Sequence, residues 1–389
     1  MLRYNKRAFH TTRQLSATKT VLYGWGQTTA LPLTEGHMDR IFHSPVCLKS
    51  QKDYALPRDQ HITHVATGWG HSLIGTELNQ VYAFGLNQSG QLGTLGVGYQ
   101  VLANEQEKLK LLACGREHSH MVTENEDATT QLYSFGNNMY GQLGLGRNKN
   151  THAGQLVAEQ IPRLVSLDKQ EIIQQIQCGL DSTLFSTENG SIYGMGWSAD
   201  GQLGQGKDDQ TKPSRLALSA PIKKLSSSTD FTLALSQDGR LWTWGNSEYG
   251  QGAQGKVIDR ILEPCLVDFP NVIDVAAGGP FSVFLTKGGN VYTCGYGALG
   301  LGNNAIQTLE PKEIKELKEI KKIYAATDYA AAITASGELY TWGLNGPTSG
   351  RLGLGHEDHA FVPQRVKIDK RVIDVSLGTY HAIAICDDE

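Results

Sequence analysis

One short phrase recurs along almost the whole chain, and its period limits the possible folds more than any other feature. It consists of an aliphatic residue, an aromatic residue, a variable residue, an apolar residue and a glycine, and it occurs seven times. The closing glycines are 48 to 60 residues apart and are Gly26, Gly85, Gly136, Gly196, Gly245, Gly295 and Gly343. Recurrence at such a period indicates a repeat architecture in which each repeat is one structural unit.

Each phrase has fixed neighbours. A GQLG-like turn follows it, as in residues 140–146, and a second apolar stretch that ends in small residues precedes it. Turn pairs such as Asn189-Gly190 and Asp238-Gly239 separate the two apolar stretches. Short apolar runs joined by such pairs are typical of antiparallel hairpins. We therefore expect several short strands per repeat, almost no helix, and structural glycines in tight turns.

The two ends of the chain complete this pattern. Residues 372–386 form the first half of a repeat without its second half, and residues 21–26 form a second half without its first. Hairpin sheets of this size bury both faces only by stacking, and radial stacking produces a β-propeller. Pairing of the two ends would complete a seventh blade and leave no open edge. The sequence predicts an all-β, seven-bladed β-propeller closed by its N-terminal and C-terminal strands, as a single domain over residues 20–389.

Residues 1–19 differ from the rest in composition. They contain no acid, many hydroxyl groups and five basic residues, Arg3, Lys6, Arg7, Arg13 and Lys19. This composition is typical of a mitochondrial transit peptide, and a disordered basic N-terminus is the alternative. The whole chain has a net charge of −4, whereas the remainder has 30 basic and 39 acidic residues, a net charge of −9. Such a body does not favour bare nucleic acid as a partner. No apolar run approaches the roughly 18 residues of a membrane helix.

Motifs for metals and nucleotides are weak. The six cysteines contain no C-x-x-C pair, which favours structural thiols in a reducing compartment. The glycine-rich segments 201–207 and 295–300 approach nucleotide-binding patterns, but both lie in the phase of the repeat and neither is expected to open a helix. We therefore expect no metal site and no cofactor.

Two adjacent positions in each repeat carry the candidate site. One position holds His71, His118 and His381, but elsewhere it holds Ser182, Phe231, Phe281 and Tyr329. That variety indicates mainly packing or hydrogen bonding. The preceding position is a carboxylate in four repeats, at Glu117, Asp181, Asp230 and Asp328. Because the position falls in a turn between strands, symmetry would gather these carboxylates on one rim, where they suit a basic protein surface.

The repeat unit as a whole resembles the regulator of chromosome condensation repeat family. The resemblance covers residues 21–389 and rests on Cys/Ala-Gly-x-x-His-Ser, a hairpin, Tyr-x-Trp/Phe-Gly and the GQLG turn. Residues 196–204, 243–251 and 294–302 are similar to its mitochondrial member. The resemblance implies a binding protein without covalent chemistry, namely a guanine-nucleotide exchange factor. Its partner would be a mitochondrial GTPase of the dynamin-like fusion class, in the matrix or peripherally on the matrix side of the inner membrane.

The same resemblance implies a partner-binding face. It comprises His71, Glu117, His118, Asp181, Asp230, Asp328 and His381. Ser182, Phe231 and Phe281 depart from the family pattern. The resemblance therefore indicates where on the surface the partner binds better than it indicates the mechanism of exchange. Residues 28–61 and 147–171 exceed the repeat length. Within the second, residues 147–160 would correspond to the wedge that displaces nucleotide in the founding member, or they are a tolerated insertion.

Besides exchange, a second and a third function remain open on the sequence alone. The mitochondrial member also suggests a non-catalytic scaffold in mitochondrial ribosome assembly or RNA modification. With a body of charge −9, such a scaffold would bind assembly proteins and not naked RNA. The third is an enzyme with an active site on the rim.

Overall fold

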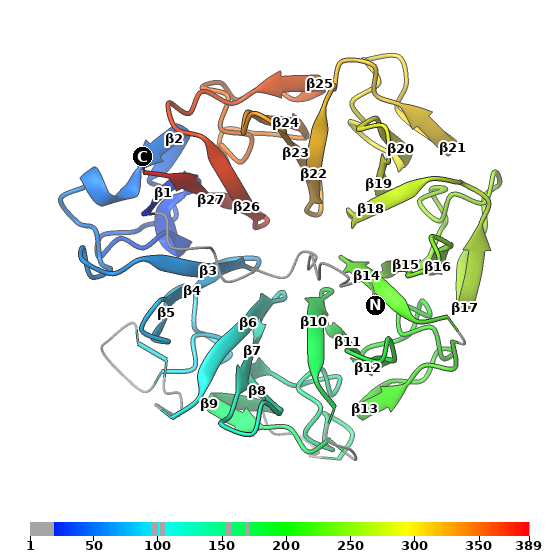
Figure 1. Cartoon of the computed structure of the whole chain (residues 1–389), viewed down its shortest axis with the longest axis horizontal. Helices are drawn as coiled ribbons and strands as arrows, with labels where there is room; N and C mark the ends of the chain where they lie inside the picture. Colours follow the sequence, from blue (N-terminus) through cyan, green and yellow to red (C-terminus); the bar gives the residue numbers. More distant parts are fainter. Residues whose placement is uncertain are drawn as a thin grey trace, which may run out of the picture.

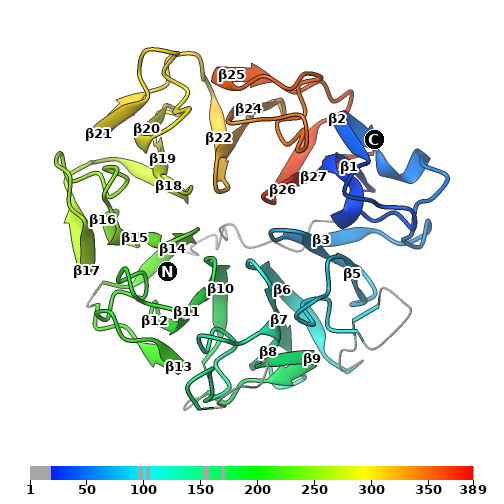
Figure 2. The ribbon, with the colours of Figure 1, turned by 180° about the vertical axis from the view of Figure 1, so that it is seen from behind.

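The repeats form the blades of a seven-bladed propeller, shown along its axis in Figure 1 and from behind in Figure 2. The computed structural model describes residues 19–94, 100–101, 106–151, 157–167, 171–218 and 220–388. Six sheets have four antiparallel strands, and blade 2 has three strands and an isolated bridge between Tyr82 and Gln100. The all-β fold class and the seven blades are confirmed. The transit peptide predicted at residues 1–19 stays a prediction, because residues 1–18 lie outside the described ranges.

The strands of successive blades occupy equivalent places, in order from blade 1 to blade 7. The innermost strands are β26 (Val372–Leu377), β3 (Ile62–Thr67), β6 (Lys108–Cys114), β10 (Ile173–Cys178), β14 (Ile222–Ser227), β18 (Val272–Ala277) and β22 (Ile320–Ala325). The second strands are β27 (His381–Asp387), β4 (His71–Thr76), β7 (His118–Glu124), β11 (Ser182–Thr187), β15 (Phe231–Ser236), β19 (Phe281–Thr286) and β23 (Tyr329–Thr334).

The outer half of each blade follows the same order. The third strands are β1 (Thr20–Gln27), β5 (Val81–Gly85), β8 (Thr130–Asn137), β12 (Ile192–Gly196), β16 (Leu241–Asn246), β20 (Val291–Tyr296) and β24 (Leu339–Gly343). The outermost strands, which blade 2 lacks among its described residues, are β2 (Ile41–Cys47), β9 (Ala158–Leu164), β13 (Gln210–Arg215), β17 (Arg260–Val267), β21 (Gln307–Glu313) and β25 (Ala360–Arg365). Two short 3-10 turns, η1 (Thr28–Ala30) and η2 (Leu48–Ser50), flank β2.

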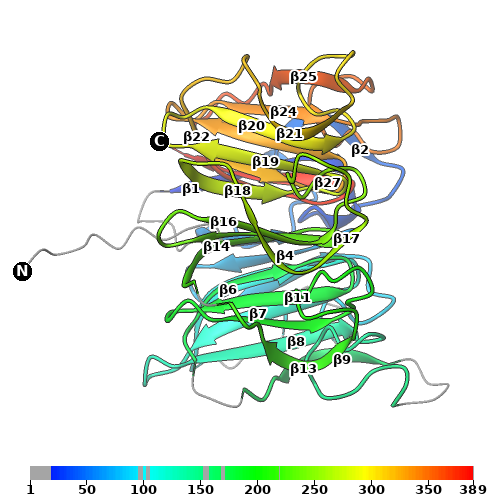
Figure 3. The same cartoon turned by 90° about the vertical axis from the view of Figure 1, so that its right-hand side faces the viewer.

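Blade 1 joins the two ends of the chain. β1 pairs with β27 from Thr20 opposite Asp387 to Gly26 opposite His381, and β2 and β26 flank this pair. The predicted closure is therefore confirmed. Both described ends lie at the same face of the disc, whose strands run between its two faces in Figure 3.

The two stretches that exceed the repeat length contain outer strands. Residues 28–61 contain β2, and residues 147–171 contain β9, which begins at Ala158. The last three residues of the segment 147–160 therefore belong to an outer strand of blade 3, while residues 152–156 lie outside the described ranges.

One register recurs in every blade. The first residue of each second strand pairs with the closing glycine of the repeat phrase, as Phe231 does with Gly245. All seven closing glycines have positive φ. At Gly245, with φ of 101°, a Cβ atom would lie 2.4 Å from the carbonyl oxygen of Asp230. Close backbone approach therefore requires glycine there.

The hydrophobic core lies between neighbouring blades. Phe231 and Leu241 of blade 5, for example, pack with Val272 and Phe284 of blade 6. The second tryptophan of the repeat phrase in blade 5 is buried, and the Nε1 of this Trp244 donates to the carbonyl oxygen of Gln202 in blade 4 at 2.9 Å. Each blade thus buries a face that it could not bury alone.

The innermost strands line a central cavity of about 240 Å³. Polar side chains at the third position of several innermost strands connect neighbouring blades. His64 Nε2 donates to the carbonyl oxygen of Lys110 at 3.0 Å, and Lys224 Nζ lies 3.2 Å from Asp274 Oδ1. The cavity wall is therefore held by contacts among its own residues. Among the described residues, no helix has the length and apolar character needed to span a membrane.

Candidate docking face

The carboxylate positions lie on one face of the disc, which we call the turn face. It consists of the turns between first and second strands and the loops between third and fourth strands. The two are joined in every blade by a backbone hydrogen bond, as from Asn246 N–H to the carbonyl oxygen of Asp230 at 2.8 Å. The equivalent donors are Gln27, Leu86, Asn137, Trp197, Tyr296 and Leu344. Repetition of this contact explains why seven turns share one face.

Three of the four carboxylates have partners within the turn face. Asp181 is buried and forms an ion pair with Arg116, and Asp328 Oδ2 lies 2.8 Å from Arg351 Nη1. Glu117 accepts hydrogen bonds from Ser89 Oγ at 3.0 Å and from Asn137 Nδ2 at 2.9 Å. These contacts hold the turns in shape and offset the charge of two of the three carboxylates.

Asp230 is the exception. Its Oδ1 is buried, and no hydrogen-bond donor of the described residues reaches it. Burial, followed by the negative charges of Asp200 and Asp181, raises the pKa of Asp230 to about 6. A carboxylate held in this way gains more than a solvated one from a new cationic partner.

Two acids near Asp230 were not predicted from the sequence. Asp200 and Glu248 lie in the loops that carry the GQLG-like turns, and the charges of both raise the pKa of Asp230. Asp200 Oδ1 lies 2.6 Å from Arg260 Nε. The structure thus brings Asp181 and Asp230 together with these two loop acids in blades 4 and 5, whereas Asp328 belongs to blade 7. A signal was available, since Asp200 directly precedes a GQLG turn.

The three histidines nominated for partner binding are not on the accessible surface. His71, His118 and His381 are buried, and each Nε2 contacts a hydroxyl in the next blade. The distances are 2.9 Å from His71 to Ser119 Oγ, 3.1 Å from His118 to Thr183 Oγ1 and 2.7 Å from His381 to Ser72 Oγ. Their burial corrects the expectation that these side chains contact a partner, because they connect blades instead.

The hydroxyl partners identify the histidine tautomer. Ser119 Oγ donates its single hydrogen to the carbonyl oxygen of Gln91 at 2.8 Å, so it accepts from His71 Nε2–H. Burial lowers the pKa of His71 to about 4, which keeps the imidazole neutral at pH 7. The GQLG turn and the His-Ser pair are therefore two halves of one clamp between blades.

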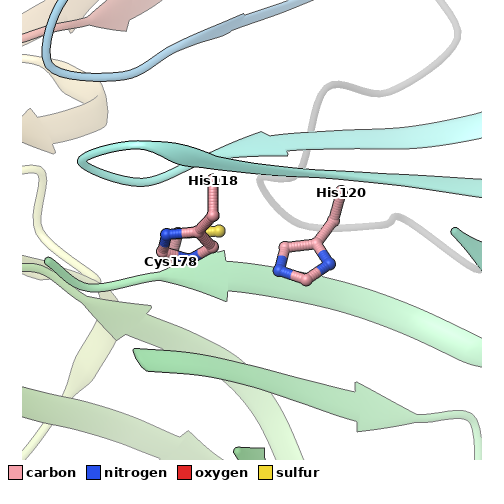
Figure 4. A group of neighbouring side chains, drawn as sticks. All are labelled: His118, His120 and Cys178. Atoms are coloured by element: carbon pink, nitrogen blue, oxygen red, sulfur yellow. The ribbon is translucent and has the colours of Figure 1, made fainter. Parts of the chain in front are cut away.

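A cluster of His118, His120 and Cys178 has the spacing of a metal site, and Figure 4 shows it. Its candidate ligand atoms lie within 4.8 Å of one another. The hydroxyl of Thr183 lies between the two imidazoles, 3.1 Å from His118 Nε2 and 2.9 Å from His120 Nε2, and donates to the carbonyl oxygen of Gln142 at 3.1 Å. Burial also raises the pKa of the Cys178 thiol well above its usual range. The geometry favours a hydrogen-bonded cluster centred on Thr183 over bound metal, whose thiol ligands must be deprotonated.

Exposed apolar side chains concentrate on the turn face. Of 13 large hydrophobic residues exposed among those described, nine lie in its turns and loops or where a strand enters them. They are Met38, Trp69, Leu86, Met139, Tyr249, Val257, Tyr296, Ile306 and Tyr380. Exposed apolar residues that gather on one face indicate a protein interaction surface. The repeat pattern did not reveal this surface, since only Tyr380 lies at either of the two positions that define the candidate site.

The turn face, its clamps and its glycines recur in a known family. A family model described as RCC1-like domain matches residues 10–284 and 157–384. The chain belongs to the RCC1-like domain family. The human "RCC1-like G exchanging factor-like protein" is 32% identical over 369 residues, which are 85% of this chain and 77% of that protein. The mouse "Regulator of chromosome condensation" is 24% identical over 394 residues, 92% of this chain and 90% of that protein.

Solved structures agree with this assignment. Human WBSCR16 is 28% identical, with a TM-score of 0.82 over 95% of this RCC1-like chain and 99% of that chain. Prp20p from Saccharomyces cerevisiae is 22% identical, with a TM-score of 0.83 over 96% of this chain and 93% of its own, and supports the fold. Binding to Gsp1p and to histones has been described for Prp20p itself.

Proposed function

We propose that this protein is a guanine-nucleotide exchange factor whose turn face binds a mitochondrial GTPase of the dynamin-like fusion class. The observation that carries the proposal is the concentration of exposed apolar side chains and buried carboxylates on the turn face. The names of two relatives, "RCC1-like G exchanging factor-like protein" and the bovine "Secretion-regulating guanine nucleotide exchange factor", support the activity.

Exchange needs no covalent step. A factor that binds the nucleotide-free GTPase more tightly than the loaded one lowers the affinity of the GTPase for GDP by the same ratio. A rigid surface suits this task, because a face that does not deform favours one conformation of its partner. The clamps between blades, such as His71 to Ser119, and the closure of β1 on β27 supply that rigidity.

The mitochondrial location is part of the proposal and rests on residues 1–19. Five basic residues, no acids and several hydroxyl groups support a transit peptide there. Fusion of residues 1–30 to a fluorescent protein should direct it to mitochondria, and substitution of Arg3, Arg7 and Arg13 by Gln should leave it in the cytosol. Cytosolic fluorescence of the unsubstituted fusion would contradict the location.

The proposed activity is tested by recovering the partner. A C-terminal tag lies at the face opposite the turn face, since Asp387 pairs with Thr20 there, so it leaves the docking face open. We expect the tagged protein to retain a GTPase from mitochondrial extract when nucleotide is removed, and to release it when GDP or GTP is added. Co-sedimentation with a ribosomal subunit, unaffected by nucleotide, would contradict exchange and favour the assembly scaffold.

A further inference from the structure

Two tyrosines bridge neighbouring blades on the turn face. The rings of Tyr249 in blade 5 and Tyr296 in blade 6 lie 5.4 Å apart, inclined by 34°. Their residues are 39% and 41% exposed. Tyr249 N–H donates to Gln251 Oε1 at 3.0 Å, and Gln307 Nε2 donates to the carbonyl oxygen of Tyr249 at 3.3 Å. The backbone of Tyr249 is therefore held in place, and its ring packs against that of Tyr296.

Two aliphatic residues belong to the same loops. Val257 is 59% exposed in the loop of blade 5, and Ile306 is 48% exposed in the loop of blade 6. With Tyr249 and Tyr296 they form what we call the tyrosine patch. Rigid tyrosines bring a large contact area at little entropic cost and are enriched where interfaces gain most of their affinity.

The charge beside the tyrosine patch is negative. Glu248 directly precedes Tyr249, and its charge reaches Asp230, whose Oδ1 has no donor among the described residues. The turn-face turns and loops of blades 4 and 5 hold seven carboxylates and two lysines; the carboxylates are Asp181, Asp200, Asp208, Asp209, Asp230, Glu248 and Asp259, and the lysines are Lys207 and Lys256. The nearest arginines are Arg116 in blade 3 and Arg260 at the start of β17. Both arginines are already ion-paired, Arg116 with Asp181 and Arg260 with Asp200 and Asp259.

We propose that the tyrosine patch and Asp230 form one docking site for a surface of the exchange partner in which an apolar side chain is flanked by a lysine or arginine. The inference rests on the proposed function, because the occupant is the GTPase assigned there. The apolar side chain packs on the two tyrosine rings. The cation lies close to the carboxylate of Asp230, whose buried Oδ1 has no hydrogen-bond donor among the described residues, and charge complementarity orients the partner.

Asp230 differs from the other three repeat carboxylates of the turn face because no described residue donates a hydrogen bond to its Oδ1. Asp181 and Asp328 have their own arginines, and Glu117 has two hydrogen-bond donors. Each of these carboxylates would lose an existing contact when a partner's cation bound to it. Asp230 Oδ1 has no such contact to lose among the described residues, so binding there carries the smallest penalty.

The experiment measures the affinity of the full-length protein for the nucleotide-free GTPase domain of the dynamin-like fusion GTPase. The variants are Tyr249→Ala with Tyr296→Ala, the same pair to Phe, and Asp230→Asn. The control is Leu78→Ala, at a residue that is 61% exposed in a turn on the opposite face. Equal melting temperatures establish that all variants fold.

We expect the double alanine variant to bind at least about tenfold more weakly, while the double phenylalanine variant and Leu78→Ala bind as the parent protein does. Asp230→Asn should weaken binding at 50 mM salt and less so at 300 mM, because salt screens the lost attraction. If the parent protein binds and the alanine variant binds equally well, the docking site is wrong and the proposed function stands. If the parent protein does not bind, the proposed function and this inference are both overturned.

Discussion

The Nε2 atom of His71 lies 2.9 Å from Oγ of Ser119 in the next blade, and that hydroxyl donates to the carbonyl oxygen of Gln91. A residue of the His-Ser pair and a residue of the GQLG turn thus meet across one interface between blades. The same connection recurs from His118 to Thr183 and Gln142. Two motifs that lie far apart within each repeat therefore have one shared role.

Replacing His71 should cost stability and spare partner binding. His71→Ala leaves Ser119 without its donor and opens a space between blades 2 and 3, so we expect a loss of about 1–3 kcal/mol in the free energy of unfolding. Urea denaturation measures the loss. An unchanged denaturation midpoint together with weaker partner binding would instead place His71 in the docking site.

Stability should fall as the pH drops below about 6.5. Burial lowers the pKa of His64 and His71 to about 4 and that of His120 and His381 to about 3, and it lowers the pKa of His118 well below its usual range. The unfolded chain therefore takes up protons between about pH 6.5 and 4 that the folded protein does not bind, so acid favours unfolding in that range. Burial also raises the pKa of Asp230, to about 6, and those of Asp181 and Asp209. These three groups act in the opposite direction, against five histidines.

Melting temperatures at pH 7.5, 6 and 5 check this dependence. The midpoint should fall with each step, and less steeply in the double variant His71→Gln, His381→Gln, which removes two of the five groups. Equal midpoints at pH 7.5 and 5 would show that these imidazoles are protonated in the folded state as easily as in the unfolded chain.

Two glycines with similar φ angles test whether close backbone contact, and not backbone conformation alone, requires glycine at the end of the repeat phrase. Gly245 has φ of 101° and its Cβ position collides with the backbone of Asp230, whereas Gly239 has φ of 88° and open space around it. We expect Gly239→Ala to cost about 1 kcal/mol from the left-handed backbone alone. Gly245→Ala should cost several times more, as measured by chemical denaturation. Similar losses at both positions would show that the collision relaxes freely.

The ion pair between Lys224 and Asp274 provides a test of the cavity wall. Both side chains are buried, with 5% and 7% exposed, and their charged atoms lie 3.2 Å apart. Lys224→Met leaves a buried carboxylate without its partner and should destabilise the protein by about 3–5 kcal/mol. The double variant Lys224→Met, Asp274→Leu should recover most of that loss. A double variant as unstable as the single one would mean that the two side chains stabilise the protein through other contacts besides their attraction to each other.

The sequence predicts the fold well because the same local sequence pattern, and so the same local structure, recurs in each repeat. The closing glycines and turn pairs specify hairpins, and the half-repeats at residues 21–26 and 372–386 specify the closure between β1 and β27. These features depend on contacts within a repeat or between equivalent repeats. A comparison of the repeats in the sequence is therefore enough to predict them.

The candidate site is less predictable because a repeat position does not tell a buried side chain from an exposed one, and because the exposed tyrosines do not follow the repeat. His71 shares its position with phenylalanines, and only the hydroxyl of Ser119 in the next blade decides that its ring faces a neighbour and not solvent. Tyr249 lies four residues after the closing glycine Gly245, whereas Tyr296 directly follows Gly295 at the end of β20, so a comparison of aligned positions does not pair them. Their contact arises from the packing of blade 5 against blade 6, which no local pattern expresses.

The most direct measurement of the proposed function is the release of a fluorescent GDP analogue from the dynamin-like GTPase, followed by stopped flow. Substoichiometric amounts of this protein should accelerate release at least about tenfold in the presence of excess GTP, with turnover over many GTPase molecules. The variant Tyr249→Ala, Tyr296→Ala should lose most of that acceleration, and Leu78→Ala should retain it. A release rate that full-length, folded protein leaves unchanged at every concentration would contradict the proposed function.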